Sequence, residues 1–187
     1  MEIIRAFIAI DVGKTIRSNL AQLQQQLKVG GADIRWNRPK TMHLTLAFIG
    51  NTPADRIEVL GTILDRDLRG VNPFTMTARG IGMFCRRKRP GVLWAGIDEN
   101  PALLELRERI VAAVDDAEIA FDNPRFRPHL TLGRFKSAAD AAPLIKLLEN
   151  ERERFLGEVR VESVELLKSE LKPDGAEHTC LHRTSFT

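Results

Sequence analysis

The stretch His43-Leu-Thr-Leu-Ala-Phe-Ile-Gly50 decides the fold, because its first four residues recur as His129-Leu-Thr-Leu132. Each copy is apolar at every second position, which predicts a β-strand. Side chains alternate along a strand, so the His and Thr of each copy point to one face and the two leucines to the other. The chain has four histidines, and two of them begin these copies. Two strands that each aim a His-x-Thr pair off one face can build a symmetric acid–base site.

The bulk composition is that of one globular domain. At 187 residues with 43% hydrophobic content, the chain can bury a single core. It has no apolar run long enough to span a membrane, and its opening decapeptide is typical of a strand rather than a signal peptide. Its two cysteines make no disulfide framework. We therefore expect a monomeric cytoplasmic protein that does not associate with a membrane.

The distribution of charge is more informative than the net charge of +3. Residues 34–54, 68–97 and 123–139 contain no Asp or Glu and carry 13 Lys and Arg, whereas acids exceed bases by ten over the rest of the chain. Two of these basic windows contain the His-x-Thr copies. Such segregation favours a ligand that bears phosphate. The basic loop 85–90 is either a contact for RNA backbone or a solvated hairpin tip.

The remaining pattern predicts a mixed α and β chain. We expect strands near 3–10, 34–36, 43–49, 73–84, 91–97, 128–135, 156–168 and 178–186. Helices are predicted after the first strand, after an N-cap at Thr52, from Asn100-Pro101, and after a cap at Ser137. Short links favour antiparallel strands. The two copies begin 86 residues apart and each precedes a helix, so residues 1–187 are expected to form one bilobal domain whose halves contribute one motif each.

The paired motif suits the chemistry of a phosphodiester. A histidine with a pKa of about 6.5 can accept or donate a proton at physiological pH. Phosphodiester cleavage needs both actions, because the attacking and leaving oxygens lie on opposite sides of phosphorus. A threonine hydroxyl on the same face can donate to a non-bridging oxygen, and an arginine such as Arg127 can add a charge-assisted hydrogen bond.

These residues carry a family resemblance. The stretches 43–50 and Phe126-Arg-Pro-His-Leu-Thr-Leu-Gly-Arg134 resemble the paired motifs of the two-histidine (2H) phosphoesterases. Within that superfamily the chain resembles the bacterial RNA 2′,3′-cyclic phosphodiesterase and 2′-5′ RNA ligase family; residues 5–10, Trp36, 91–96 and 169–171 are also similar. The resemblance implies an α+β fold with two pseudo-symmetric halves, mostly antiparallel sheets flanking a central cleft, and helices outside.

The resemblance also implies an activity. Family members open an RNA 2′,3′-cyclic phosphate to a 2′-phosphate without metal or cofactor, and some join tRNA fragments through a 2′-5′ bond. Carried over, His43 would be the proton donor to the 3′ oxygen and His129 the proton acceptor from water. Thr45 and Thr131 would hold the phosphate, and Arg127 and Arg134 would neutralise it.

One departure concerns the end of the chain. The family commonly has a tyrosine shortly after the late glycine, Gly175, but this chain has no tyrosine and places His178 there. We expect His178 and His182 to be strand or surface residues without a catalytic role. Trp36 and Phe84 could stack on a base, but we expect both in the core.

Four other functions compete with this one. A metal hydrolase is disfavoured because the basic windows lack carboxylates. A cysteine phosphatase is disfavoured because Gly91 stands where the spacing from Cys85 requires arginine. A non-catalytic RNA- or nucleotide-binding module, and a phosphodiesterase acting on another cyclic nucleotide, stay open as alternatives.

Overall fold

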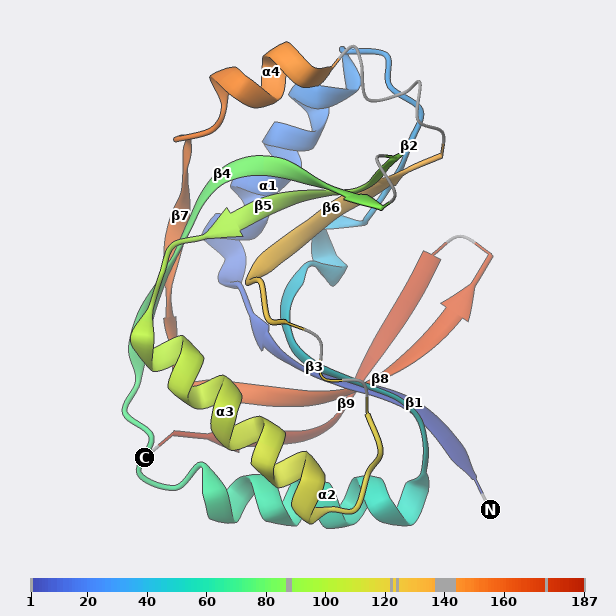
Figure 1. Ribbon diagram of the computed structural model, residues 1–187, viewed down its shortest axis with the longest axis vertical. Coiled ribbons are helices and arrows are strands. Elements are labelled where there is room, and N and C mark those ends of the chain that lie inside the picture. The colour runs from blue at the N-terminus through green and yellow to red at the C-terminus, as the bar shows by residue number, and fades with distance from the viewer. Residues whose placement is uncertain are drawn as a thin grey trace.

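The computed structural model describes residues 2–86, 89–121, 123, 125–136, 144–173 and 175–186, with backbone alone at 86, 89 and 90. Over these residues the strands form one curled sheet in the order β7–β4–β5–β6–β3–β1–β8–β9, with β2 beside β6 (Figure 1). Neighbouring strands run antiparallel throughout. The predicted fold class, α+β with mostly antiparallel strands, is confirmed.

The elements follow the sequence pattern closely. The strands are β1 (Ile3–Asp11), β2 (Ile34–Trp36), β3 (His43–Pro53), β4 (Phe74–Arg86), β5 (Arg89–Ile97), β6 (His129–Phe135), β7 (Phe155–Val161), β8 (Ser163–Lys172) and β9 (Gly175–Ser185). The helices are α1 (Gly13–Lys28), α2 (Ala54–Asp67), α3 (Pro101–Asp116) and α4 (Ile145–Asn150), with a 3-10 turn, η1, at Pro39–Thr41. None of the described helices is long and apolar enough to cross a membrane.

The two histidine strands lie at the middle of the sheet. From β6 the sheet continues through β5, β4 and β7, and from β3 it continues through β1, β8 and β9. Each histidine strand therefore lies where the two sides of the sheet meet, with three further strands beyond it on this path and β2 also beside β6. Leu44 is paired with Leu130 where the halves meet. Helix α1 packs against β7 on one side, and α2 packs against α3 and β9 on the other.

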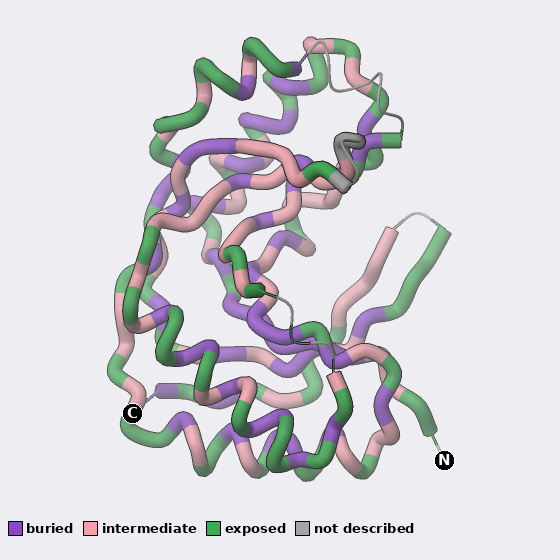
Figure 2. Tube along the Cα trace, viewed as in Figure 1, coloured by how far each residue is buried: buried purple, intermediate pink, exposed green. Residues whose placement is uncertain are grey.

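The core lies on the face opposite the motif histidines. Leu44 and Leu130 are fully buried, at 0% exposure, and α1 buries Ile16, Leu20 and Leu23 as its periodicity predicts (Figure 2). Each fully buried leucine contributes about 1.5–3 kcal/mol relative to exposure. Because one register of β3 and one of β6 bury these leucines, the same registers direct the His and Thr side chains to the other face.

Two local predictions were wrong. The strand expected at 156–168 is divided into β7 and β8 at Glu162. Thr52 does not cap α2: it is buried in β3 and pairs with Ile4, and β3 continues to Pro53 just before the helix. In contrast, Asn100 caps α3 as predicted, because its Oδ1 accepts the Leu103 N–H at 3.2 Å. The predicted cap Ser137 and loop residues 87 and 88 lie outside the described residues.

Candidate active site

The structure brings the two His-x-Thr pairs together across β3 and β6. Leu44 pairs with Leu130, and the antiparallel direction of this pairing turns His43 toward Thr131 and Thr45 toward His129. All four side chains are half-buried. The two predicted catalytic histidines and the two predicted phosphate-binding threonines thus form one pseudo-symmetric group.

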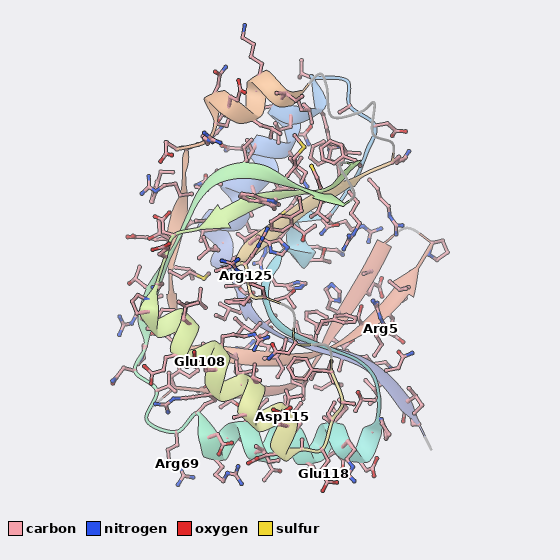
Figure 3. The ribbon with its side chains drawn as sticks, viewed as in Figure 1. Arg5, Arg69, Glu108, Asp115, Glu118 and Arg125 are labelled. Atoms are coloured by element: carbon pink, nitrogen blue, oxygen red, sulfur yellow. The ribbon has the colours of Figure 1, made fainter. Side chains whose placement is uncertain are left out.

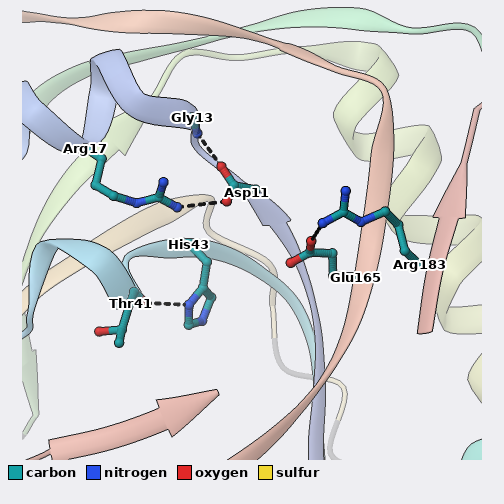
Figure 4. Close-up of polar contacts among 7 residues, drawn as sticks. All are labelled: Asp11, Gly13, Arg17, Thr41, His43, Glu165 and Arg183. Carbon is teal, nitrogen blue, oxygen red and sulfur yellow. Dashed lines mark hydrogen bonds and ion pairs between the residues drawn. The ribbon is translucent and has the colours of Figure 1, made fainter. Parts of the chain in front are cut away.

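The same backbone contact orients both imidazoles. Nδ1 of His43 lies 2.8 Å from the carbonyl oxygen of Thr41, and Nδ1 of His129 lies 2.8 Å from that of Arg127 (Figure 4 shows the first). A carbonyl can only accept, so each Nδ1 donates a proton to it. The neutral rings are therefore held as the tautomer whose Nε2 carries a lone pair. Each half presents a basic Nε2 by the same device.

His43 stands in an apolar and aromatic setting. Phe7 stacks on its ring with centroids 4.6 Å apart, His178 meets it edge-on at 5.3 Å, and Thr45 donates its hydroxyl to Nε2 at 3.1 Å. Burial lowers the pKa of His43 to about 4; the Thr41 carbonyl opposes this, and repulsion from His178 adds to it. His43 is accordingly neutral at pH 7 in the free protein.

His129 has a comparable setting in the other half. The ring of Phe84 lies edge-on to it at a centroid distance of 4.9 Å. Burial lowers the pKa of His129, the Arg127 carbonyl opposes that shift, and the nearby charge of Arg134 adds to it. Both motif histidines are thus shifted toward the neutral form.

A carboxylate lies beside His43 without binding it. Asp11 is opposite His43 in the β1–β3 register, but it accepts from the Gly13 N–H at 2.5 Å and from Arg17 at 2.8 Å (Figure 4). Burial alone would raise the pKa of Asp11, but these bonds hold it below its usual value. Asp11 is thus paired with Arg17, and the hydrogen-bond partner of His43 Nδ1 is the Thr41 carbonyl.

Two adjoining cavities flank the motif. One, of about 550 Å³, is lined by His43, Thr45 and Thr131, and also by Arg5, Phe7, Arg35, Trp36, Arg134 and His178. The other, of about 450 Å³, is lined by His129 and Arg127 together with Phe84, Phe121, Phe126 and Arg125. Thr45 and Phe48 line both cavities, so they form a shared wall between the two histidines. We call these the His43 cavity and the His129 cavity.

The two predicted arginines are divided between these cavities. Arg134 lines the His43 cavity and Arg127 lines the His129 cavity, where its guanidinium lies 6.0 Å from the ring of Phe84. Both side chains are exposed. Figure 3 shows the same separation for two arginines that the motifs did not single out: Arg125 lies before β6, and Arg5 lies toward the β8–β9 hairpin. A phosphate at the shared wall would have cations on both sides.

His178 lies in strand β9, as predicted, and it also contacts His43 and lines its cavity; its position after the late glycine was the available signal. Two sequence-based placements need correction. Trp36 and Phe84 are half-buried and line the two cavities, rather than being enclosed in the core. His182 is a half-buried strand residue of β9, with Nε2 2.9 Å from Asp65. Among the described residues, no three His, Cys, Asp or Glu side chains gather as a metal-binding group would require.

Residues 19–173 match the sequence model of a protein family, the 2′-5′ RNA ligase superfamily. The chain belongs to this superfamily. It is 31% identical over 182 residues to the RNA 2′,3′-cyclic phosphodiesterase of Thermotoga maritima, covering 97% of this chain and 95% of that one. The phosphodiesterase of the same name from Methanothermobacter thermautotrophicus is 30% identical, covering 94% and 95%.

Solved structures agree with this assignment. The apo form of E. coli LigT has a TM-score of 0.80 at 26% identity, covering 100% of this chain and 99% of that one. TT0787 of Thermus thermophilus has a TM-score of 0.78 at 30% identity, with 97% of each chain covered. The family resemblance, the 2H phosphoesterase fold and the expectation of an enzyme of the hydrolase type are therefore confirmed.

Proposed function

We propose that this enzyme opens RNA 2′,3′-cyclic phosphate ends to 2′-phosphates, with His43 and His129 as a general acid and a general base. The main support is the geometry of the two imidazoles, which come from adjacent strands β3 and β6. In each ring Nδ1 is hydrogen-bonded to a backbone carbonyl, so Nε2 is available on the same face of the sheet. The relatives named RNA 2′,3′-cyclic phosphodiesterase support the substrate. E. coli LigT has also been solved in complex with phosphate, at 26% identity to this chain.

The proposed reaction places phosphorus at the shared wall. Nε2 of His129 takes a proton from a water molecule, whose oxygen attacks phosphorus as the bond from phosphorus to the 3′ oxygen breaks. The protonated Nε2 of His43 gives its proton to the departing 3′ oxygen. The products are a 2′-phosphate and a free 3′-hydroxyl. Thr45 and Thr131 donate to non-bridging oxygens, and Arg127 and Arg134 offset the charge that develops there.

The acid role of His43 requires that substrate binding change its protonation. The free ring has a pKa of about 4 and accepts the Thr45 hydroxyl at Nε2. A bound phosphodiester brings one negative charge beside the ring, which favours the protonated form and raises its pKa. Once Nε2 carries a proton it can donate to Thr45 Oγ1, and the Thr45 hydroxyl is released to donate to the phosphate. Thr45 would thereby couple phosphate binding to protonation of His43.

Ligation through a 2′-5′ bond would use the same groups, with a ribose hydroxyl replacing water. The same proposal includes RNA, tRNA fragments among it, as the natural substrate. It also includes a monomeric state and a cytoplasmic location for the protein. The alternatives are a non-catalytic RNA-binding module and a phosphodiesterase for another cyclic nucleotide. The first would retain the arginine-lined cavities without needing both imidazoles.

The test uses short RNAs that end in a 2′,3′-cyclic phosphate, with products separated into 2′- and 3′-phosphates. We expect the wild-type protein to yield 2′-phosphate, and His43→Ala and His129→Ala each to lower kcat by roughly 100-fold or more. His182→Ala is the matched control, because His182 lies outside both cavities. Unchanged turnover in both motif variants would reject the mechanism. Strong inhibition of the wild type by chelators would reject its metal independence.

A further inference from the structure

An arginine occupies a core position of helix α3. Arg107 lies between Leu103 and Ile110 on the buried stripe of this helix, and only 7% of its surface is exposed. Arginine is rarely buried to this extent, because its charge loses hydration there. Burial lowers the pKa of Arg107 accordingly, and its Nε has no hydrogen-bond partner among the described residues. A buried charge is weak evidence for stability, so the contacts of its guanidinium indicate what it does.

The guanidinium of Arg107 holds the last part of the connection from α3 to β6, residues 120–128. It donates to Asn123 Oδ1 at 2.6 Å, and it lies 5.5 Å from the ring of Phe126 and 6.0 Å from the ring of Phe121. A cation at such a distance from an aromatic ring is attracted to it. Figure 1 shows the connection running from the end of α3 to the start of β6. Arg107 therefore joins the helix to three places along this segment.

The same segment carries the carbonyl group that orients His129. The Arg127 carbonyl oxygen lies 2.8 Å from Nδ1 of His129, and Arg127 directly follows Phe126, whose ring meets Arg107. No described residue within 120–128 forms a backbone–backbone hydrogen bond with another described residue. The position of this carbonyl therefore depends on side-chain contacts, and those of Arg107 are the nearest ones in the chain.

The matching carbonyl in the other half is held by the backbone itself. Thr41 ends the turn η1, in which the Thr41 N–H donates to the Arg38 carbonyl at 3.0 Å and the Met42 N–H to the Pro39 carbonyl at 3.1 Å. The Thr41 hydroxyl donates to the Arg38 carbonyl as well, at 3.0 Å. The two halves thus share the carbonyl contact to Nδ1 but support it differently: one uses a hydrogen-bonded turn and the other uses the side chain of Arg107.

We infer that Arg107 is a positioning residue for His129: it keeps the Arg127 carbonyl where that oxygen accepts from Nδ1, and so leaves Nε2 free to act as a base. This inference rests on the proposed function, in which His129 takes a proton from water. Without the carbonyl contact, the neutral ring can carry its proton on Nε2, and that tautomer cannot accept a proton at the same atom. Holding the correct tautomer is a large part of what supports a histidine base.

The first experiment observes the imidazoles of the free enzyme. Arg107→Met keeps an apolar side chain in the helix and removes the guanidinium. Nitrogen-15 NMR reports which nitrogen of each ring carries the proton. We expect both motif histidines of the wild type to be protonated at Nδ1, because each is tied there to a carbonyl. In Arg107→Met we expect a mixture of tautomers at His129, while His43 is unchanged because its carbonyl belongs to η1.

Steady-state kinetics separate positioning from substrate binding. With an RNA that ends in a 2′,3′-cyclic phosphate, Arg107→Met should lower kcat roughly 10- to 100-fold and leave KM nearly unchanged, because a misoriented base still permits binding. Asn123→Ala removes the acceptor of the guanidinium and should have a smaller effect in the same direction. The double variant should be no slower than Arg107→Met, since both changes break one hydrogen bond.

Arg109→Met is the matched control on the same helix. Arg109 donates to Glu105 at 2.8 Å and lines neither cavity beside the histidines. This variant removes a guanidinium from α3 without touching the segment that leads to β6. It should keep the wild-type kcat and the wild-type tautomer of His129.

The outcomes distinguish this inference from the proposed function. If His129 stays protonated at Nδ1 in both Arg107→Met and Asn123→Ala, the inference is rejected. It is also rejected if KM rises while kcat is kept, since Arg107 would then contact the substrate. If His129→Ala turns over at the wild-type rate, the proposed function fails, whereas the tautomer in the free enzyme tests the orienting role by itself. Asn123→Ala carries the test if Arg107→Met does not fold, because Asn123 is exposed.

Discussion

The imidazole of His178 meets the ring of His43 edge-on, with 5.3 Å between their centroids and an interplanar angle of 85°. Phe7 completes the cluster, stacking on His43 and lying 5.0 Å from His178. Strands β1, β3 and β9 each contribute one of these rings. The His43 imidazole therefore packs against two rings, and one of them, His178, is itself titratable.

Replacing that neighbour should change the titration of His43. Repulsion from His178 is one of the causes that lower the pKa of His43, after burial. In His178→Phe the ring contact is kept and the charge is removed, so we expect the pKa of His43 to rise. A pH titration of the His43 ring signals by NMR measures it. An unchanged pKa would show that His178 acts on His43 by packing alone.

Thr45 should matter through its hydroxyl rather than its shape. Thr45→Val keeps the volume but removes the group that donates to His43 Nε2 at 3.1 Å, and by our proposal to the phosphate. Loss of such a bond is worth about 1–3 kcal/mol, so kcat/KM should fall roughly 5- to 150-fold. Thr45→Ser restores the hydroxyl and should recover most of the rate. Steady-state kinetics of both variants decide this, and equal loss in both would point to packing.

The central pair of strands could be predicted from the sequence, because apolar residues alternate with polar ones and only one register buries both Leu44 and Leu130. That register also sets which face of the sheet the adjacent His and Thr side chains occupy. The ring of His178 escaped prediction because its place depends on two long-range pairings, β1 with β8 and β8 with β9. The separation of Arg127 from Arg134 was also beyond local pattern. Arg127 lies before β6, which begins at His129, and the register of β6 against β5 shifts between Thr131 and Gly133, so simple alternation along the strand does not place Arg134.

The displaced pKa of His43 should also appear in folding stability. The folded pKa is about 4, below the unfolded value of about 6.5, so the unfolded chain binds more protons between these values. Stability from this source is therefore complete above about pH 6.5 and is lost as pH falls toward 4, by at most about 3 kcal/mol for His43.

Urea unfolding at pH 7 and at pH 4.5 measures this loss. His43→Gln should show a smaller difference between the two pH values than the wild type. His182→Gln, at a half-buried position outside both cavities, is the control for loss of an imidazole and should show a larger difference than His43→Gln. If His43→Gln loses as much stability as the wild type on acidification, His43 does not carry the effect.

Binding of phosphate should reverse the protonation state that the free protein imposes on His43. Inorganic phosphate at the shared wall places negative charge beside the ring, which favours the imidazolium and raises the pKa of His43 above about 4. The pH dependence of kcat/KM reports the free enzyme and that of kcat reports the complex. We therefore expect the limb of the pH profile that belongs to His43 to lie at higher pH in kcat than in kcat/KM.

NMR titration of His43 with and without phosphate measures the same change in pKa directly. In Thr131→Val the phosphate-induced rise in this pKa should be smaller. A ring that titrates alike in both conditions would mean that phosphate does not bind beside His43, and the acid role proposed for it would fail.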